Sequence, residues 1–332
     1  MIHEKIISDI LNNLNQESYF RENVDFIHPR TNSLVSMHSS SFNAFNVINQ
    51  EAIEAKVNFI FVDGGSSVIF ECGSYCLALI RLAAVHYNYN NSVNCQQRNV
   101  YEFFLLIKSN GELTYYNKPD FLKDSSCMKT ETFLEAVNSI RRLHELQLSD
   151  YFVNKYKDQQ DYYIVLDGSF DSNNSNHSNN KNDNEQLIIQ SWINDNDNVI
   201  GISKSSRLLT IDENGLIDTI KLMFPSKAGF FINYENNIAF AKFHDKSKFI
   251  FRLDFASRKN ISNISNAFLY LSLFSKDSIF IGYPFGLFEA DRVARVTNEE
   301  VKYYRSLLNT KIDINSIESN LSAHSVLDNA RF

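Results

Sequence analysis

The sequence predicts an α/β protein in which one mixed sheet is flanked by helices. Apolar runs between residues 57 and 117 are separated by short turns, and the Asn110-Gly111 pair is a strong hairpin signal. Residues 130–157 then show helical periodicity without glycine or proline, and the strand YYIVLD follows at 162–167. An antiparallel meander followed by a helix and a further strand favours a parallel pairing of that last strand with one of the meander.

The first half of the chain supplies the elements of this meander. Residues 1–16 place isoleucine and leucine at helical spacing, which predicts an amphipathic helix that packs on the core or, alternatively, docks a partner. Thr132 and Glu135 have the spacing of a capping box at the start of the long helix. The predicted strands before that helix are 57–63, 68–72 and 75–85, with a hairpin over 101–117.

The second half is predicted to complete the same domain. Residues 171–185 are rich in asparagine and serine and read as a flexible loop. Strands are expected at 199–203, 230–234, 238–243, 248–255 and 278–281, and helices at 262–275 and 298–332. Without repeats or a clear linker, residues 1–332 are predicted to form a single domain, comprising an N-terminal helical extension (1–56), a core (57–170), the loop (171–185) and the remainder (186–332).

Composition limits the classes of function. The chain has 332 residues, is 44% hydrophobic and carries a formal net charge of −7, so it should pack a globular core and is not a uniformly basic nucleic-acid binder. The apolar stretch 75–87 is interrupted by Arg81 and is too short to span a bilayer. The four cysteines lack C-x-x-C spacing and nothing resembles a signal peptide, which together predict reduced thiols and a cytoplasmic location.

Three acidic residues stand out by their positions. Asp63 in VNFIFVDGGSS and Asp167 in YYIVLDGSF each end an apolar run, which predicts carboxylates at two strand tips. Ordinary Asp-Gly-Ser turn chemistry is the alternative for each string alone. Glu145 lies on the apolar stripe of the long helix, where an acid needs a metal ion or an ion pair such as one with Arg141.

The order of these acids resembles that of the ribonuclease H-like fold, in which an acid on the first strand, one on a helix and one on a later strand converge on metal ions. The chain further resembles the NurA family of 5′-3′ nucleases from about residue 57 to 310. The segments that carry this resemblance are FVDGGS at 61–66, RRLHELQLS at 141–149, IVLDGSF at 164–170, GISKSSR at 201–207 and GYPFGLFEADRVARV at 282–296.

The resemblance implies a DNA hydrolase with two Mn²⁺ or Mg²⁺ ions, which hard carboxylate ligands suit. Its metal ligands would be Asp63, Glu145, Asp167 and Asp291, although Glu289 lies only two positions from the last of these. Lys204 would neutralise the phosphate or orient a water, unless it is an ordinary surface lysine. A basic cluster that alternates with aromatic residues could follow a DNA backbone or form a solvated strand face: Lys242, Lys246, Lys248 and Arg252.

The resemblance also implies a homodimer that works with a HerA-like hexameric translocase in DNA repair, resecting the 5′ ends of double-strand breaks. Two other classes of function stay open. Asp63-Gly64-Gly65-Ser66 also fits the D-x-G-[ST] phosphate loop of actin-like and sugar-kinase-like ATP-binding enzymes. A non-catalytic subunit that shapes DNA for a motor is the third possibility.

Overall fold

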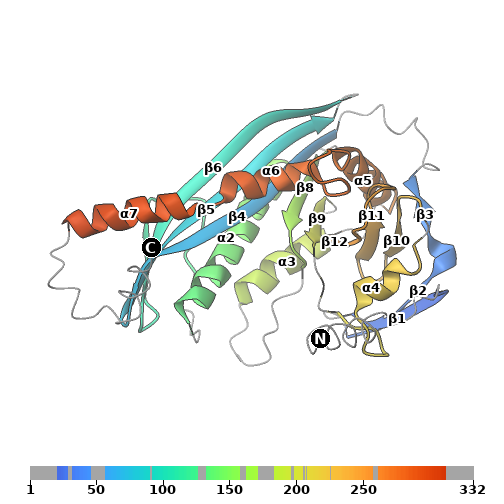
Figure 1. The fold of residues 1–332 in the computed structure, drawn as a ribbon, viewed down its shortest axis with the longest axis horizontal. Helices are drawn as coiled ribbons and strands as arrows, with labels where there is room; N and C mark the ends of the chain where they lie inside the picture. Colours follow the sequence, from blue (N-terminus) through green and yellow to red (C-terminus); the bar gives the residue numbers. More distant parts are fainter. Residues whose placement is uncertain are drawn as a thin grey trace, which may run out of the picture.

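The centre of the molecule is a ten-stranded mixed sheet (Figure 1). The structure, a computed structural model, describes residues 21–28, 32–45, 57–89, 92–125, 132–157, 162–170, 183–195, 198–204, 206, 208–224, 226–256 and 261–311. The strands of the sheet lie in the order β3-β10-β11-β12-β9-β8-β4-β5-β6-β7. Their bounds are β3 Asn43–Ala44, β4 Val57–Cys72, β5 Tyr75–Tyr89, β6 Val93–Lys108, β7 Leu113–Tyr116, β8 Tyr162–Asp167, β9 Val199–Ser203, β10 Gly229–Asn233, β11 Ile238–Lys242 and β12 Phe251–Ala256.

Five adjacent strands have the predicted topology. β4, β5 and β6 form an antiparallel meander, β8 pairs parallel to β4, and β9 pairs parallel to β8. The long helix α2 (Phe133–Lys155) stands between the meander and β8 in the chain. This order, β6-β5-β4-β8-β9, is the ribonuclease H-like mixed sheet that the sequence predicts.

Helices cover both faces of the sheet. α2 and α3 (Asp183–Asp195) pack on one apolar cluster, whereas α5 (Ile261–Phe274) and α6 (Phe285–Ala294) pack on the other. α7 (Asn298–Lys311) follows α6 along the long strands of the meander (Figure 1). The remaining elements are α4 (Leu216–Lys221), the 3₁₀ turn Ser39–Ser41 and a separate hairpin of β1 (Asn23–Ile27) and β2 (Leu34–His38). No described helix is both long enough and apolar enough to cross a membrane.

The strand that contains Asp63 does not end there, which corrects the prediction. β4 spans 16 residues in all and runs on to Cys72, and Gly64, Gly65 and Ser66 each pair with a residue of β5. Neither glycine has a positive φ, so the Gly-Gly pair is not a turn. The phosphate loop on which the actin-like alternative depends is therefore a regular part of a hairpin.

The two glycines are required instead for close approach. A β-carbon at Gly64 would lie 2.5 Å from Oε1 of Glu145 on α2, and one at Gly65 would lie 2.2 Å from the carbonyl oxygen of Ala294 at the end of α6. Because neither glycine has a side chain, α2 can contact β4 at Gly64 on one face of the sheet and α6 can contact it at Gly65 on the other. The second tip is as predicted, because β8 ends at Asp167 and Gly168 follows with a φ of +106°.

Other predictions of local structure meet different outcomes. The cap of α2 is confirmed, since Oγ1 of Thr132 accepts a hydrogen bond from the Glu135 backbone N–H at 3.2 Å. Residues 183–185 belong to α3 rather than to the predicted loop, and 278–281 form turns rather than a strand. The described part of the predicted helical extension consists mainly of β1, β2 and β3, while the predicted helix at 1–16 lies outside the described residues.

Candidate metal centre

Asp63 and Asp167 lie next to each other on neighbouring parallel strands. The register pairs Phe61 with Val165 and Val62 with Leu166, so the two aspartates follow at the next position of each strand. Side chains alternate along a strand, which places both carboxylates on the face of Phe61 and Val165, the face that α5 and α6 cover. The pairing that follows from the hydrophobic pattern thus brings two acids together at one edge of the helix-covered face.

Helix α6 brings a third acid to the same face. A β-carbon at Gly286 would lie 2.0 Å from the Phe61 ring, and the end of α6 lies against Gly65, so the helix runs along β4 past Asp63. Asp291 on this helix is 39% exposed, and its Oδ2 lies 3.1 Å from a guanidinium nitrogen of Arg295.

Glu289, the other acid on α6, belongs to a separate group of charges. Its buried carboxylate forms ion pairs with Arg98 at 2.9 Å and with Arg292 at 2.7 Å. These two guanidinium groups help hold the pKa of Glu289 below its usual range, the hydrogen bond from Arg292 having the largest effect. Of the two candidate acids on α6, Asp291 is therefore the one near Asp63.

Glu145 approaches Asp63 from the opposite side of the sheet. Its side chain is 3% exposed and fills the space that Gly64 leaves open on the α2 face. Arg141 pairs with Oε1 and donates to the Gly64 carbonyl at 2.9 Å, while Arg142 lies 3.2 Å from Oε2. The ion pair with Arg141 is thus present, and it holds Glu145 behind the Asp63–Gly64 backbone.

The carboxyl group of Asp63 is the electrostatic centre of this arrangement. Asp63 is 7% exposed, and within the described part of the chain its carboxylate accepts a single hydrogen bond, from the Gly64 N–H at 2.8 Å. Burial raises the pKa of Asp63 well above its usual range, and the negative charges of Glu145, Asp167 and Asp291 raise it further. Acids from α2, β8 and α6 therefore all add to the negative charge around Asp63 on β4.

Two further side chains complete the group. Nζ of Lys204, just after β9, lies 2.6 Å from Oδ2 of Asp167 and 5.0 Å from the ring centre of Tyr283. Burial lowers the pKa of Lys204, but the carboxylates of Asp167, Asp63 and Asp291 together more than offset this effect, so the pKa is raised.

Tyr283 is a site residue that the sequence prediction did not include, although the Tyr-Pro pair within GYPFG was a signal for it. Its side chain is buried, and within the described residues its hydroxyl has no hydrogen-bond partner. Burial raises the pKa of Tyr283, and the charges of Asp167, Asp63 and Asp291 add to this shift.

The donor set fits a hard divalent cation in its chemistry. Carboxylate oxygens are the ligands that Mg²⁺ and Mn²⁺ prefer. Across the described ranges, no three histidine, cysteine, aspartate or glutamate side chains are close enough to hold one metal ion as they stand. Arg141, Arg142 and Lys204 neutralise Glu145 and Asp167, whereas buried Asp63 has a raised pKa and no ion pair within the described residues. A cation at Asp63 would supply the missing positive charge.

The basic residues predicted to contact DNA do not form one surface. Lys246 and Lys248 are exposed, and Nζ of Lys242 donates to the Ser226 carbonyl at 3.1 Å. The side chain of Arg252 is 3% exposed and pairs with buried Asp254 at 2.7 Å. Arg252 is therefore wrongly placed in the predicted cluster, because it points into the fold.

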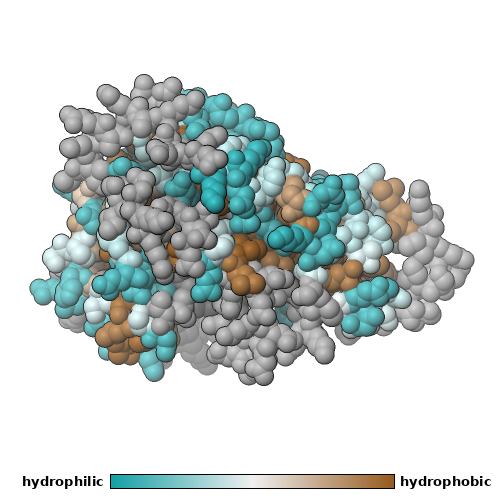
Figure 2. Space-filling view, turned by 180° about the vertical axis from the view of Figure 1, so that it is seen from behind, coloured by the Kyte–Doolittle hydropathy of each residue, from teal (hydrophilic) through white to brown (hydrophobic). Residues whose placement is uncertain are grey.

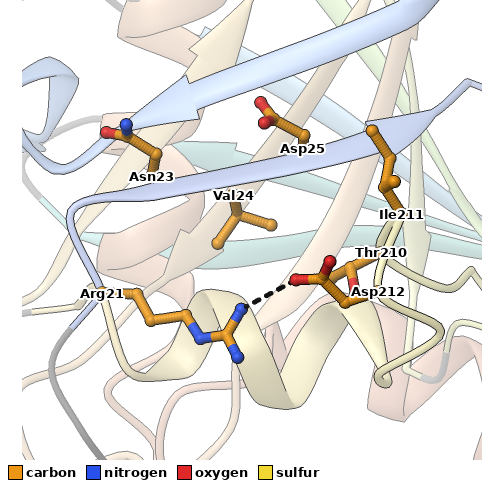
Figure 3. Close-up of a pocket in the computed structure, with 7 residues that line it drawn as sticks. All are labelled: Arg21, Asn23, Val24, Asp25, Thr210, Ile211 and Asp212. Carbon is orange, nitrogen blue, oxygen red and sulfur yellow. Dashed lines mark ion pairs between the residues drawn. The ribbon is translucent and has the colours of Figure 1, made fainter.

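A surface pocket near β1 is separate from the acid group. It is lined by Arg21, Asn23, Val24, Asp25, Thr210, Ile211 and Asp212 (Figure 3). Its volume of about 130 Å³ has room for a few water molecules, and an ion pair of 3.5 Å between Arg21 and Asp212 spans it. None of its lining residues belongs to the acid group, so the chemistry does not reside in this pocket.

Comparisons with known proteins give remote structural likenesses. No family model matches the chain, and no curated protein matches it. Human endonuclease V is 11% identical with a TM-score of 0.38, covering 75% of this chain and 85% of that one. Endonuclease V of Ciona intestinalis, in complex with a 24mer DNA containing an inosine followed by a ribo-adenosine, is 12% identical with a TM-score of 0.40, covering 80% and 94%. An Argonaute of A. aeolicus is 11% identical with a TM-score of 0.33, covering 72% and 28%. At these values the activity must be argued from the residues of this chain itself.

Proposed function

We propose that this protein is a metal-dependent nuclease that hydrolyses phosphodiester bonds in DNA. The observation that carries the proposal is the buried carboxylate of Asp63, which lies beside the end of β8 at Asp167 and next to α6; burial raises its pKa, and the charges of Glu145, Asp167 and Asp291 raise it further. A charge cluster of this kind is costly without a function or a counter-ion. Asp63 lies on a central strand of the sheet and is followed across the parallel pairing by Asp167 on the neighbouring strand, which supports the proposal.

The residues have distinct roles in this proposal. Asp63, Asp167 and Asp291 on the α6 face would hold the divalent ions, whereas Glu145 lies behind Gly64 and would have to leave its ion pairs with Arg141 and Arg142 to join them. Bound ions would lower the pKa of an attacking water and stabilise the leaving oxygen. The ammonium group of Lys204, 47% exposed beside Asp167, would neutralise the phosphate.

The finer assignment rests on the five segments that resemble NurA nucleases. We infer a 5′-3′ exonuclease with single-strand endonuclease action as a second mode, two Mn²⁺ or Mg²⁺ ions, a homodimer, and a HerA-like translocase as the partner in end resection. Each of these properties can be tested apart from hydrolysis itself.

The first experiment measures cleavage of DNA labelled at either end by the full-length protein with Mn²⁺, Mg²⁺ or EDTA. Cleavage should require the metal, and Asp63→Asn should lower the cleavage rate at least about 100-fold. Asp291→Asn should also lose activity, whereas its matched control Glu289→Gln, on the same helix but paired with arginines, should keep its cleavage rate if the protein remains folded.

Two results would contradict the proposal. Wild-type cleavage rates in Asp63→Asn would remove Asp63 from the centre. DNA binding without any cleavage, in any of the metals, would favour the non-catalytic subunit instead.

A further inference from the structure

Beside the acid group, two aromatic rings are exposed to solvent. Phe249 is 54% exposed and Phe280 is 40% exposed, although they come from segments about 30 residues apart in the chain. Their rings are stacked, with centroids 5.6 Å apart and planes at 16°. Exposed phenylalanines that stack on each other leave apolar ring surface in water, which is unfavourable unless another group covers it.

The aromatic pair Phe249–Phe280 is connected to the acid group by ring contacts. Phe280 makes an edge contact with Tyr283 at 5.4 Å between centroids. Tyr283 in turn lies below the ammonium group of Lys204, which is bound to Asp167. The Tyr283 ring thus contacts both the aromatic pair and the lysine of the acid group.

The two segments that carry the pair are held against each other. Gly282 has a φ of +93°, and a β-carbon there would lie 2.3 Å from Oγ of Ser247, so only glycine permits this approach. The same Oγ accepts a hydrogen bond from the Phe249 N–H at 3.1 Å, and the Tyr283 N–H donates to the Phe280 carbonyl at 3.1 Å. The backbones that carry the two rings are therefore held together without a ligand, which lowers the entropic cost of binding.

The charges around the pair are of both signs with a small positive excess. The exposed lysines are Lys246, Lys248 and Lys276, and the acids on the same segments are Asp245 and Asp277. Stacking surfaces for bases next to lysines that meet the phosphates are the two components of single-strand binding sites. Because Phe280 contacts Tyr283, which in turn contacts Lys204, the pair suits a base whose own strand continues toward Asp167.

We propose that the aromatic pair Phe249–Phe280 is a stacking platform for an unpaired base of the DNA strand whose phosphate enters the acid group. This inference rests on the proposed function, for which it names a subsite and a single-stranded ligand. The lysines beside the platform guide the backbone, and the stacked base fixes the register of the strand relative to Lys204 and Asp167.

The test measures binding of a fluorescent single-stranded oligonucleotide to the full-length protein in EDTA, so that no strand is cut. Phe249→Ala should weaken binding about 5- to 150-fold, the loss of one stacked base, and Phe249→Trp should restore it. Ile279→Ala is the matched control, because this side chain is 68% exposed beside Phe280 but offers no ring, and it should change binding less than about twofold.

An abasic position moved along the oligonucleotide identifies the stacked base. One abasic position should weaken wild-type binding as much as Phe249→Ala does, and the same position should have no further effect in Phe249→Ala. Independent, additive losses from the abasic site and the substitution would overturn the platform. Unchanged binding with a changed molecular mass in light scattering would also overturn it and assign the pair to a protein contact.

Failure of the platform and failure of the nuclease proposal give different results. If the wild type cleaves DNA but its binding is insensitive to Phe249→Ala and to every abasic position, the platform is refuted and hydrolysis stands. If binding shows the predicted coupling but no metal supports cleavage, hydrolysis is refuted and the platform stands.

Discussion

The carboxylate of Asp63 lies at a place in the fold that disfavours its negative charge. Because burial and three carboxylates raise the pKa of Asp63, its ionised form destabilises the folded state at neutral pH, and this cost declines as the pH falls through the raised pKa. Asp63→Asn keeps the acceptor for the Gly64 N–H and removes the charge. In EDTA, the variant should therefore unfold at a higher temperature than the wild type.

The control for this prediction is Asp291→Asn, since Asp291 is partly exposed and already paired with Arg295. Its unfolding temperature should move less. Mn²⁺ should raise the unfolding temperature of the wild type by binding the folded state, and this gain should shrink in Asp63→Asn. A lower unfolding temperature for Asp63→Asn in EDTA would show that its charge is compensated by a group other than a metal ion.

His144 makes a second residue-scale prediction, about pH. It is fully buried, its Nδ1 faces Oε1 of Gln147 at 3.0 Å, and burial lowers its pKa to about 4. The unfolded chain, with a pKa near 6.5, binds this proton first as the pH falls. The stabilising effect of neutral His144 is therefore complete above about pH 6.5 and is lost between there and about pH 4.

Replacing His144 by leucine should remove this dependence. Between about pH 6 and 4.5, the free energy of unfolding of the wild type should fall more steeply than that of His144→Leu, by up to about 1.4 kcal/mol per pH unit. His86, whose pKa burial also lowers to about 4, should leave a residual slope in the variant. Urea titrations across this range measure both slopes, and equal slopes would show that His144 takes up a proton in the folded protein.

The sequence predicts which acids belong to the site more readily than it predicts how they are arranged in space. Asp167 and Lys204 are in direct contact; the order of acids along the chain predicts Asp167, whereas Lys204 is predicted only by the resemblance of GISKSSR to the NurA family. That Glu145 lies behind the sheet depends on which face each helix covers, and this is not encoded in a local string. Tyr283 was missed because a buried tyrosine is ordinary in a sequence and becomes unusual only when its hydroxyl lacks a partner.

At the scale of elements, the junction between β4 and α6 depends on Gly65. A β-carbon there would lie 2.2 Å from the Ala294 carbonyl oxygen, a backbone atom that moves only with the end of α6. Gly65→Ala should therefore destabilise the protein by about 1–3 kcal/mol and shift the helix that carries Asp291. Its nuclease activity should fall more than its stability alone explains at a temperature where it remains folded.

Gly73→Ala is the matched control for this prediction. Gly73 lies at the turn of the same hairpin, its φ is not in the left-handed region, and a β-carbon there meets no atom within 4 Å. This substitution should change stability by less than about 0.5 kcal/mol and leave cleavage intact. Denaturant titrations of the two variants compare the positions, and equal effects would show that α6 adjusts without cost.

The elements differ in how far their sequences determine them. α2 and α5 follow from periodicity, and β8 and β9 from short apolar runs between turn residues. Asp-Gly-Gly-Ser is typical of turns and predicts the end of a strand at Asp63, but pairing with β5 and contacts from two helices override that local preference. The apolar residues Ile279 and Phe280 predict a strand at 278–281, yet both are exposed and lie in turns.

For the whole molecule, the meander and the parallel strand set the fold class before any contact is known. The remaining strands extend the sheet in the order β9-β12-β11-β10-β3, which local patterns cannot specify. On the face shown in Figure 2, hydrophobic residues are exposed in several separate patches between hydrophilic ones. Surface hydropathy therefore does not by itself mark a functional face, and the site emerges only from the long-range packing.

One such long-range contact joins the first half of the sheet to the last helices. Arg81 on β5 pairs with Glu102 on β6 and, at 2.6 Å, with Glu300 on α7, and it donates to the Arg295 carbonyl at 2.7 Å. The hydrogen bond from Arg81 has the largest effect in lowering the pKa of Glu300 to about 2. The stabilisation from this contact is therefore fully present above about pH 4.5 and is lost as the pH falls toward 2.

Because Arg295 follows Asp291 by one helical turn, Arg81 also helps hold the end of α6, the helix that carries Asp291, against β4. Arg81→Met leaves two carboxylates facing each other and should release α7, so that amide hydrogens of residues 298–308 exchange faster. Activity should fall by up to about 100-fold through displacement of Asp291 while the sheet stays folded. Lys108→Met, which removes an exposed ion pair at the far turn of β6, should change neither measurement. Faster exchange in α7 with undiminished cleavage would show that Asp291 is positioned by its contacts with β4 alone.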